Sequence, residues 1–563
     1  MRLTGSMRLA AVAVMLAAAV AACGGSSTTG GGGTVKKGGI LRIGTVGEID
    51  SLNPFVAIES QSTNAFVMEY PQLVQYGPPG ITIQGDLATS WTSSKSGLVW
   101  TFHLHPHTLW SDGKPLTSAD VAWTGNTILK YQSGPTATQA AALAGIEKFT
   151  APNPSTVVIT YTKPIGNVLA QLEQFFILPE HVWGKYTGGH GADLKTYLPQ
   201  QHLPTVTGGP YVISQYQEHG TTVFKPNPHF YGPKSNAEAV TLTYYTNPTS
   251  MVADLEAGNL DFVDQVPFSA AKTLSGQSSL AVQVGSSDEV TNITFNSNPL
   301  KPKNRELLNP KVREALEYAT PRAQIVNVVF NGFAKPWANL ISEQSVSAGW
   351  VDPSVKPLPY DPSKANQILD SLGYKMGSGG IREVPATTGK FAQAAHPMSY
   401  QIMVPSTLDF DGNRQFLILQ AAYKKIGVNL SELPGGDSSQ AYSIETAPNG
   451  KYLNFDMATW DWAGYIDPNF MLSVLTKAQW NSWSDTGFDN PQYDAWYAEQ
   501  STMVNQKQRR QLVWKMERFI AAQRPYIQLV NEELVTAHDK QWTGFQPQLG
   551  AYCKCYYTAP HQG

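Results

Sequence analysis

Charged residues are scarce in this sequence: Asp, Glu, Lys and Arg make up 15% of its 563 residues, where roughly a quarter is usual in globular proteins. The net charge is only −3, so the charge gives no reason to expect nucleic acid or an anionic membrane surface as a partner. Apolar residues make up 42% of the chain, which is ordinary for a globular protein. A chain of this length is too long for one hydrophobic core and predicts about two to four domains.

The sequence also lacks the short motifs that mark many enzymes and nucleotide-binding proteins. It contains no GxSxG, no HExxH, no P-loop and no dinucleotide-binding glycine pattern. Because catalytic triads are recognised by geometry and not by spacing, a hydrolase stays open as an alternative on sequence alone. Aromatic residues with polar groups are plentiful by contrast, with 14 Trp and 25 Tyr, which suits a protein that binds ligands by stacking and hydrogen bonding.

Cysteine is limited to Cys23, Cys553 and Cys555. The last two are separated by a single residue, which would make a tight disulfide ring, although an oxidising compartment permits one. A zinc site would need further ligands close in the sequence, and none is evident. We therefore expect no metal and no cofactor.

The N-terminal apolar run, from Leu9 to Ala22, is about 14 residues long, which is too short to span a bilayer and typical of a signal-peptide core. It ends in residues 20–23, Val-Ala-Ala-Cys, which resemble the lipobox of bacterial lipoproteins. That resemblance implies cleavage before Cys23 and a lipid on its sulfur. In the alternative, an ordinary secretory signal, Cys23 would be incidental.

The signal peptide is thus predicted over residues 1–22, followed over residues 23–38 by the lipidated cysteine and a linker made mostly of Gly, Ser and Thr. Such a linker cannot bury apolar area and is expected to stay disordered, with a reach of roughly 20 Å. These features predict a protein on the outer face of the cytoplasmic membrane, held there by the lipid on Cys23.

Residues 460–470 are the best candidate for a ligand site, because large aromatics with polar groups and carboxylates gather there. They include Trp460, Asp461, Trp462, Tyr465 and Asp467. Residues 454–460 predict a strand and residues 469–475 the start of a helix, with Asp467 as its N-cap and Pro468 at its first position. A strand, a loop and a helix N-terminus commonly build a concave site on a rigid scaffold. The alternative is that these aromatics fill a domain core.

Elsewhere the pattern predicts regular elements with identifiable boundaries. Residues 39–44 predict a strand, residues 63–74 a helix, and residues 98–105 a half-buried strand with alternating apolar and polar positions. Thr117 and Asp120 have the spacing of a capping box, which predicts a helix that begins just after Thr117.

Several stretches, read in order, carry recognisable patterns. They are residues 110–123, 207–211, 227–231, 255–262, 309–322 and 360–374. For example, residues 207–211, Thr-Gly-Gly-Pro-Tyr, resemble a GTGPY turn, and residues 312–315, Val-Arg-Glu-Ala, the VRxA of a helix. Together these patterns resemble those of the extracytoplasmic solute-binding proteins of ABC importers, in the group that includes oligopeptide, dipeptide and nickel binders. The resemblance covers nearly the whole chain.

The resemblance implies an α/β, periplasmic-binding-protein-like fold of two lobes that are joined by a two-strand hinge and hold the ligand between them. The implied parts are lobe I at 39–294, with an extra subdomain at about 71–205, lobe II at 295–523, and a return to lobe I at 524–563. The two hinge strands are expected near 291–296 and 525–529.

The resemblance further implies a monomeric receptor, not an enzyme, that captures a ligand, foremost an oligopeptide, and delivers it to ABC permease subunits. The implied ligand-binding residues are Trp460, Asp461, Trp462, Gly464, Tyr465, Asp467, Asn53 and Phe55. In peptide-binding relatives an Asp of this loop pairs with the peptide's amine. Its position here is Gly464, which leaves Asp461 as the candidate replacement.

Two alternatives keep the transport role but change the ligand. One is an oligosaccharide stacked on Trp460, Trp462 and Tyr465, and the other is a metal complex. An alternative of another class is a hydrolase at the cell surface.

Two further patterns could indicate metals. His103, His105 and His107 alternate and would share one face of a strand, where imidazoles can bind a transition metal, but a proline interrupts them. Residues 409–412, Asp-Phe-Asp-Gly, hint at a calcium loop, but the later ligands of an EF-hand are missing, so an Asp-Gly turn is expected there.

Overall fold

The computed structural model describes residues 38–78, 80–406, 410–434, 436, 455–480, 482–545, 554 and 558–563. The predicted signal peptide, the lipobox cysteine and nearly all of the linker lie outside these ranges, as do Cys553 and Cys555. Within them, no helix has the length and apolar character that crossing a membrane requires.

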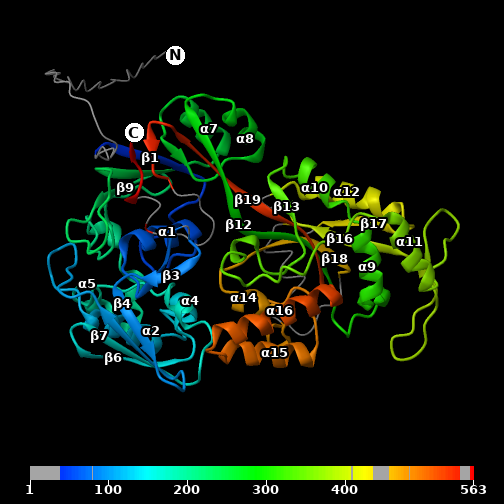
Figure 1. Cartoon of the computed structure of the whole chain (residues 1–563), viewed down its shortest axis with the longest axis horizontal. Helices are drawn as coiled ribbons and strands as arrows, with labels where there is room; N and C mark the ends of the chain where they lie inside the picture. The colour runs from blue at the N-terminus through cyan, green and yellow to red at the C-terminus, as the bar shows by residue number, and fades with distance from the viewer. Residues whose placement is uncertain are drawn as a thin grey trace, which may run out of the picture. The chain divides into compact units, whose positions relative to one another are not determined.

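Eleven strands form one sheet around a pair of long antiparallel strands, β12 (Leu280–Phe295) and β19 (Tyr526–Asp539) (Figure 1). On one side of this pair follow, in order, β11 (Phe262–Val263), β1 (Ile40–Thr45), β10 (Ala239–Tyr244), β9 (Thr221–Pro226) and β8 (Tyr211–Gln215). On the other side follow β18 (Met457–Ala463), β16 (Ser399–Val404) and β17 (Asn429–Pro434), while β13 (Ala334–Pro336) pairs with β19. The two long strands therefore connect the two halves of the sheet.

The ladder between β12 and β19 is interrupted in its middle. Its pairs run from Leu280 opposite Asp539 to Ser286 opposite Glu533, and they resume at Val290 opposite Asn531. Such a bulge bends a strand and re-aims its side chains. The interruption separates the part of the pair that lies beside β11 from the part that lies beside β18.

A second, antiparallel sheet is made of β4 (Ala88–Ser93), β5 (Val99–Leu104), β7 (Thr156–Tyr161) and β6 (Ile146–Asn153), and α2 (Ser118–Lys130) packs on it. The strand predicted at residues 98–105 is confirmed as β5, with Trp100, Phe102 and Leu104 buried in the core. The capping box is confirmed as well. The amide of Thr117 donates to Asp120 Oδ2 (2.9 Å), and the amide of Ala119 donates to Thr117 Oγ1 (3.2 Å).

The helix predicted at residues 63–74 is α1 (Ser60–Glu69), which begins and ends earlier than expected. Pro71 restricts the residue before it, so Tyr70 is extended, with φ −101° and ψ 143°. The end of the predicted helix belongs instead to β2 (Val74–Gly77), which pairs with β3 (Thr82–Gly85).

Several helices begin with proline after an Asn or Asp whose side chain caps the helix. They are α7 (Pro248–Glu256), α9 (Pro310–Tyr318), α11 (Pro362–Ser371) and α15 (Pro491–Thr502). Asp411 and Asn505 cap the longer helices α12 (Gly412–Lys424) and α16 (Gln506–Gln523). Since Asp411 Oδ1 accepts the amide of Arg414 (2.9 Å), it serves as a helix cap, and Asp409 lies outside the described residues.

The remaining elements are short. They are α3 (Ala137–Ala140), α4 (Val168–Leu172), α5 (Glu180–Trp183), α6 (Asp193–Thr196), α8 (Phe268–Ser275), α10 (Arg322–Val328), α14 (Asn469–Ser473), β14 (Glu383–Val384), β15 (His396–Pro397), β20 (Trp542–Thr543) and β21 (His561–Gln562). One large core lies among α9, α11, α12 and β16, and another lies between the second sheet and its helices.

We expect Thr117→Ala to lower the free energy of unfolding by about 1 kcal/mol, because the first turn of α2 loses the side chain that accepts an otherwise unpaired amide. Thr117→Ser keeps the hydroxyl and should stay close to wild type. Chemical denaturation of both variants measures the difference. Equal losses for Ala and Ser would contradict a capping role.

Candidate ligand-binding site

The stretch predicted as an aromatic and acidic loop is partly a strand. Residues 454–460 were expected to be extended, whereas β18 runs from Met457 to Ala463, and residue 454 lies outside the described ranges. The strand continues because β12 pairs with it along its whole length, up to Ala463 opposite Glu289, which satisfies its backbone groups. Trp460, Asp461 and Trp462 therefore occupy a strand, and the loop proper starts at Gly464.

Strand geometry separates Asp461 from its aromatic neighbours, since successive side chains point to opposite faces. Trp462 is buried, and its Nε1 donates to Asp485 Oδ2 (3.0 Å). Trp460 is half-buried and packs beside Met403. Asp461, also half-buried, belongs to the other face.

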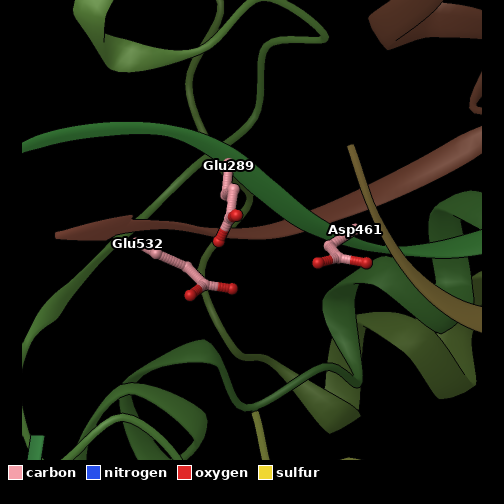
Figure 2. Close-up of side chains that lie close together, drawn as sticks. All are labelled: Glu289, Asp461 and Glu532. Atoms are coloured by element: carbon pink, nitrogen blue, oxygen red, sulfur yellow. The ribbon is translucent and has the colours of Figure 1, made fainter. Parts of the chain in front are cut away.

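On that face three carboxylates come together from three strands (Figure 2). Glu289 belongs to β12, Asp461 to β18 and Glu532 to β19, and one carboxylate oxygen from each lies within 4.8 Å of the others. We call these three residues the acidic cluster. Among the described residues this is the one group of three His, Cys, Asp or Glu side chains close enough to hold an ion together.

The acidic cluster sits at the interruption of the β12–β19 ladder. Glu532 lies opposite the interruption, and its Oε1 accepts from Thr291 Oγ1 (2.8 Å). Ser287 Oγ donates to the carbonyl oxygen of Glu532 (3.1 Å), and the amide of Glu289 donates to Ser287 Oγ (3.1 Å). The bulge is thus held by hydrogen bonds in a shape that turns Glu289 toward the other two acids. Like charges this close repel one another, and a bound cation relieves the repulsion.

Sequence reasoning found Asp461 but missed Glu289 and Glu532. They are far apart in the chain, and only strand pairing makes them neighbours, so a single sequence carries no signal for the cluster. The alternating histidines behave differently. His105 stacks on Tyr231 with ring centroids 5.3 Å apart, His107 has a left-handed backbone (φ 56°), and the three do not form an ion-holding group in the described part of the chain.

The loop after β18 exposes one aromatic ring. Tyr465 is 53% exposed and meets Phe470 edge-on, with centroids 5.8 Å apart. Partial burial raises the pKa of its hydroxyl, and the nearby charges of Glu173 and Asp288 add to the increase. Glu173 follows α4 in a distant part of the chain, and burial raises the pKa of its carboxyl to about 8. Acidic groups from two separate segments therefore lie near Tyr465.

Gly464, the position of the amine-binding Asp in peptide-binding relatives, has little room for a side chain. Its amide donates to the carbonyl of Asp288 (3.0 Å), and its carbonyl accepts from Gln344 Nε2 (2.7 Å). A Cβ atom here would lie 3.2 Å from Cγ of Met471. A larger residue would have to displace that methionine.

Asp467 is committed to contacts within the protein. Its Oδ2 accepts from Nη1 of Arg509 (2.5 Å) and its Oδ1 from Nη2 (2.7 Å). Arg509 is 0% exposed, donates from Nε to Gln500 Oε1 (3.0 Å) and lies over the ring of Trp350. The helix α14 begins at Asn469 as predicted, but its N-cap position is Pro468 and not Asp467.

Asn53 and Phe55 are each 1% exposed. Asn53 Nδ2 donates to the carbonyls of Leu194 (2.8 Å) and Tyr197 (2.9 Å), while its Oδ1 accepts the amide of Phe55. Phe55 packs edge-on against Trp183. The structure thus places both residues in the core beside the second sheet and does not bring them to the acidic cluster.

The fold is that of the periplasmic binding proteins. DppA of Helicobacter pylori, in complex with peptide STSA, superposes with a TM-score of 0.70 at 20% identity, covering 94% of this chain and 98% of DppA. HbpA2 of Haemophilus parasuis gives a TM-score of 0.77 at 19% identity, covering 93% of this chain and 100% of HbpA2. The predicted two-lobed α/β fold is confirmed.

Residues 82–483 match the profile of the bacterial extracellular solute-binding proteins, family 5 Middle, so the chain belongs to this family of binding proteins. A protein of Brucella ovis named as an ABC transporter peptide-binding protein is 29% identical over 342 residues, which span 59% of this chain and 59% of that relative's length. The glutathione-binding protein GsiB of Pectobacterium atrosepticum is 26% identical over 529 residues, which span 90% and 91% of the two chains.

We expect Asp467→Asn to lower the free energy of unfolding by about 3–5 kcal/mol, because it leaves the buried charge of Arg509 without its partner. Asp411→Asn is the matched control. It alters an exposed Asp–Arg pair, and Asn caps a helix as well as Asp does, so the loss should stay below about 1 kcal/mol. Urea unfolding compares the two variants, and similar small losses would show that the buried pair is dispensable.

Proposed function

We propose that this protein captures an oligopeptide outside the cytoplasm and delivers it to the permease of an ABC importer, with the ligand's ammonium group bound at the acidic cluster. The observation that carries the proposal is the cluster itself, which brings the carboxylates of Glu289, Asp461 and Glu532 together. An ammonium group carries positive charge and donates three hydrogen bonds, so it can bind several carboxylates at once.

The relatives support a peptide ligand. The Brucella ovis relative is named as a peptide-binding protein, GsiB as a glutathione-binding protein, and the DppA structure holds peptide STSA. All three ligands are peptides or contain peptide bonds. A binding protein needs no covalent step, so this family membership favours a receptor over the hydrolase alternative.

Ligand capture in this proposal works by a population shift. A ligand that contacts both lobes favours the closed state only to the extent that it binds the closed state more tightly than the open state. We place the lobes as the sequence implied, with lobe I at 39–294 and 524–563 and lobe II at 295–523. The interrupted ladder supports a hinge at residues 286–290 and 531–533, slightly displaced from the segments 291–296 and 525–529.

The finer location also belongs to the proposal. A lipid on Cys23, followed by a Gly- and Ser-rich linker, would keep a monomeric receptor at the outer face of the cytoplasmic membrane.

One alternative ligand class has a specific observation in its favour. Three carboxylates suit a hard cation with oxygen ligands, so a metal complex in the same transport role is the second candidate. A stacked oligosaccharide is less favoured, because Trp462 is buried and Trp460 half-buried, which leaves Tyr465 as the exposed ring of this stretch.

The ligand can be identified directly. The protein, purified without its lipid anchor, should carry ligand. Denaturation should release intact peptides, which mass spectrometry identifies. If a metal complex or a sugar is released instead, the ligand is that compound and not a peptide. Steady hydrolysis of added peptides by the purified protein would contradict the receptor role.

The role of the cluster is testable with a double cycle. We expect Asp461→Asn to weaken binding of the peptide Ser-Thr-Ser-Ala by about tenfold or more, since a charged hydrogen bond contributes roughly 1.5–3 kcal/mol. N-acetylation of the peptide should weaken binding to the wild type by a similar factor. The two losses should not add, because both remove the same interaction.

The control for this cycle is Glu432→Gln, which removes an exposed carboxylate from β17 and should leave both affinities unchanged. Calorimetry measures all combinations. Fully additive losses would place the ammonium group elsewhere.

A further inference from the structure

The turn between α15 and α16 touches a segment just before α4, far from the hinge (Figure 1). The amide of Gly166 donates to the carbonyl of Ser501 (2.8 Å), and Gln506 Nε2 donates to the carbonyl of Gly166 (2.6 Å). With the proposed lobes, Gly166 belongs to lobe I, and the two helices belong to lobe II. This contact therefore joins the lobes at a point other than β12 and β19.

The contact depends on backbones that approach closely. A Cβ atom on Gly166 would lie 2.7 Å from the carbonyl oxygen of Gln500 and 3.0 Å from that of Met503. Both obstacles are backbone atoms, so neither can turn aside as a side chain would. A second glycine, Gly97, lies close to the side chain of Val504, since an added Cβ would be 2.8 Å from Cγ2 of that valine. The surface of lobe I is shaped to receive this turn.

Arg509 connects the contact to the loop of the candidate site. Its Nε lies 3.1 Å from where a Cβ atom on Gly166 would stand, and it donates to Gln500 Oε1 (3.0 Å). Its other two nitrogens hold Asp467, two residues after Tyr465. One buried guanidinium thus touches the site loop and the turn, and it lies against lobe I.

A residue of lobe I also interacts electrostatically with the Asp467–Arg509 pair. Tyr76 of β2 is 5% exposed. Burial raises the pKa of its hydroxyl, the charges of Glu173 and Asp467 raise it further, and Arg509 opposes the increase. The Asp467–Arg509 pair therefore lies close to lobe I at more than one point.

We propose that Arg509 is a positioning residue that couples the ligand loop at 464–468 to the lobe contact at Gly166, so that ordering one favours forming the other. The planar guanidinium of Arg509 holds its five N–H donors in a fixed geometry. If the loop moves Asp467, the guanidinium must move with it, and this shifts its contact with the turn. Coupling between two sites is reciprocal, so a ligand that orders the loop strengthens the lobe contact, and the lobe contact raises ligand affinity. The biological role of this coupling rests on the proposed receptor function, but the coupling itself is present without ligand.

The test measures amide hydrogen exchange in the full chain without ligand. Gly166→Ala forces the backbones of lobe I and the turn apart. We expect exchange to become about fivefold faster or more at residues 500–506. We expect the same at the two ends of the loop, where the amides of Gly464 and of Asn469, the residue after the loop, are hydrogen-bonded. The matched control is Gly184→Ala in the same part of lobe I, where the backbone is helical and the nearest neighbour of the new Cβ is the flexible side chain of Glu180 at 3.6 Å. It should change neither segment.

Two further variants decide whether Arg509 carries the coupling. Gln506→Ala removes an exposed side chain that bonds Gly166 and should reproduce the pattern with a smaller change. Arg509→Lys keeps the positive charge but loses the planar guanidinium that binds Asp467 and Gln500 at the same time. In that background Gly166→Ala should speed exchange at residues 500–506 while leaving the loop no faster than Arg509→Lys alone.

If Arg509→Lys does not fold, Gln506→Ala and Gly166→Ala still decide the question. Faster exchange confined to residues 500–506, with the loop as in wild type, would overturn the coupling. Affinity for the peptide Ser-Thr-Ser-Ala separates this outcome from a failure of the receptor function. No binding by the wild type would count against a receptor for such peptides, whereas wild-type affinity in Gly166→Ala would count against the coupling alone.

Discussion

The pairing of β12 with β19 is the interaction on which the rest of this structure depends. Each half of the large sheet is attached to this pair, one half through β11 and the other through β18. The register of the pair also sets the chemistry of the candidate site. A slip of one residue would turn every side chain of β12 to the opposite face, which would separate Glu289 from Asp461 and Glu532. Fold and site therefore rest on the same backbone hydrogen bonds.

Two aspartates in one short stretch have opposite electrostatic surroundings. Asp467 is buried with both oxygens on Arg509, so its charge is neutralised inside the protein. Asp461 stands with two other acids. Carboxylates this close together repel one another when they are charged. Clusters of this kind are more typical of functional sites.

The sequence predicted local structure well where short-range chemistry decides it. The capping box at Thr117 and the alternating strand β5 are confirmed, because both depend on neighbouring residues. It failed where distant pairing decides: β18 runs on through Trp462 because β12 supplies its hydrogen bonds. Family resemblance gave the fold, since patterns of turns and helices survive when identity is low.

The site was harder to predict than the fold for the same physical reason. Tyr465 and Asp461 could be found because they lie in one conspicuous stretch, whereas Glu289 and Glu532 are ordinary acids on strands until the sheet forms. Asn53 and Phe55 were expected at the ligand, and the structure places them in a core. There the side-chain amide of Asn53 bonds two backbone carbonyls. In the sequence, such an asparagine looks no different from one that binds a ligand.

The position of the acidic cluster offers a reason why residue 464 is a glycine and not an acid. An acid at that position would belong to the loop of one lobe and would crowd Met471. The acidic cluster draws instead on β12, β18 and β19, and two of these strands are shared by both halves of the sheet. In the proposed function, a ligand's ammonium group would then bind to the strands about which the lobes move, and not to one lobe alone. Glu289 and Glu532 lie at the interruption of the ladder. If the lobes move about this point as proposed, neutralising the two charges would act on the bend, which would give a charged ligand a physical means to shift the lobe equilibrium.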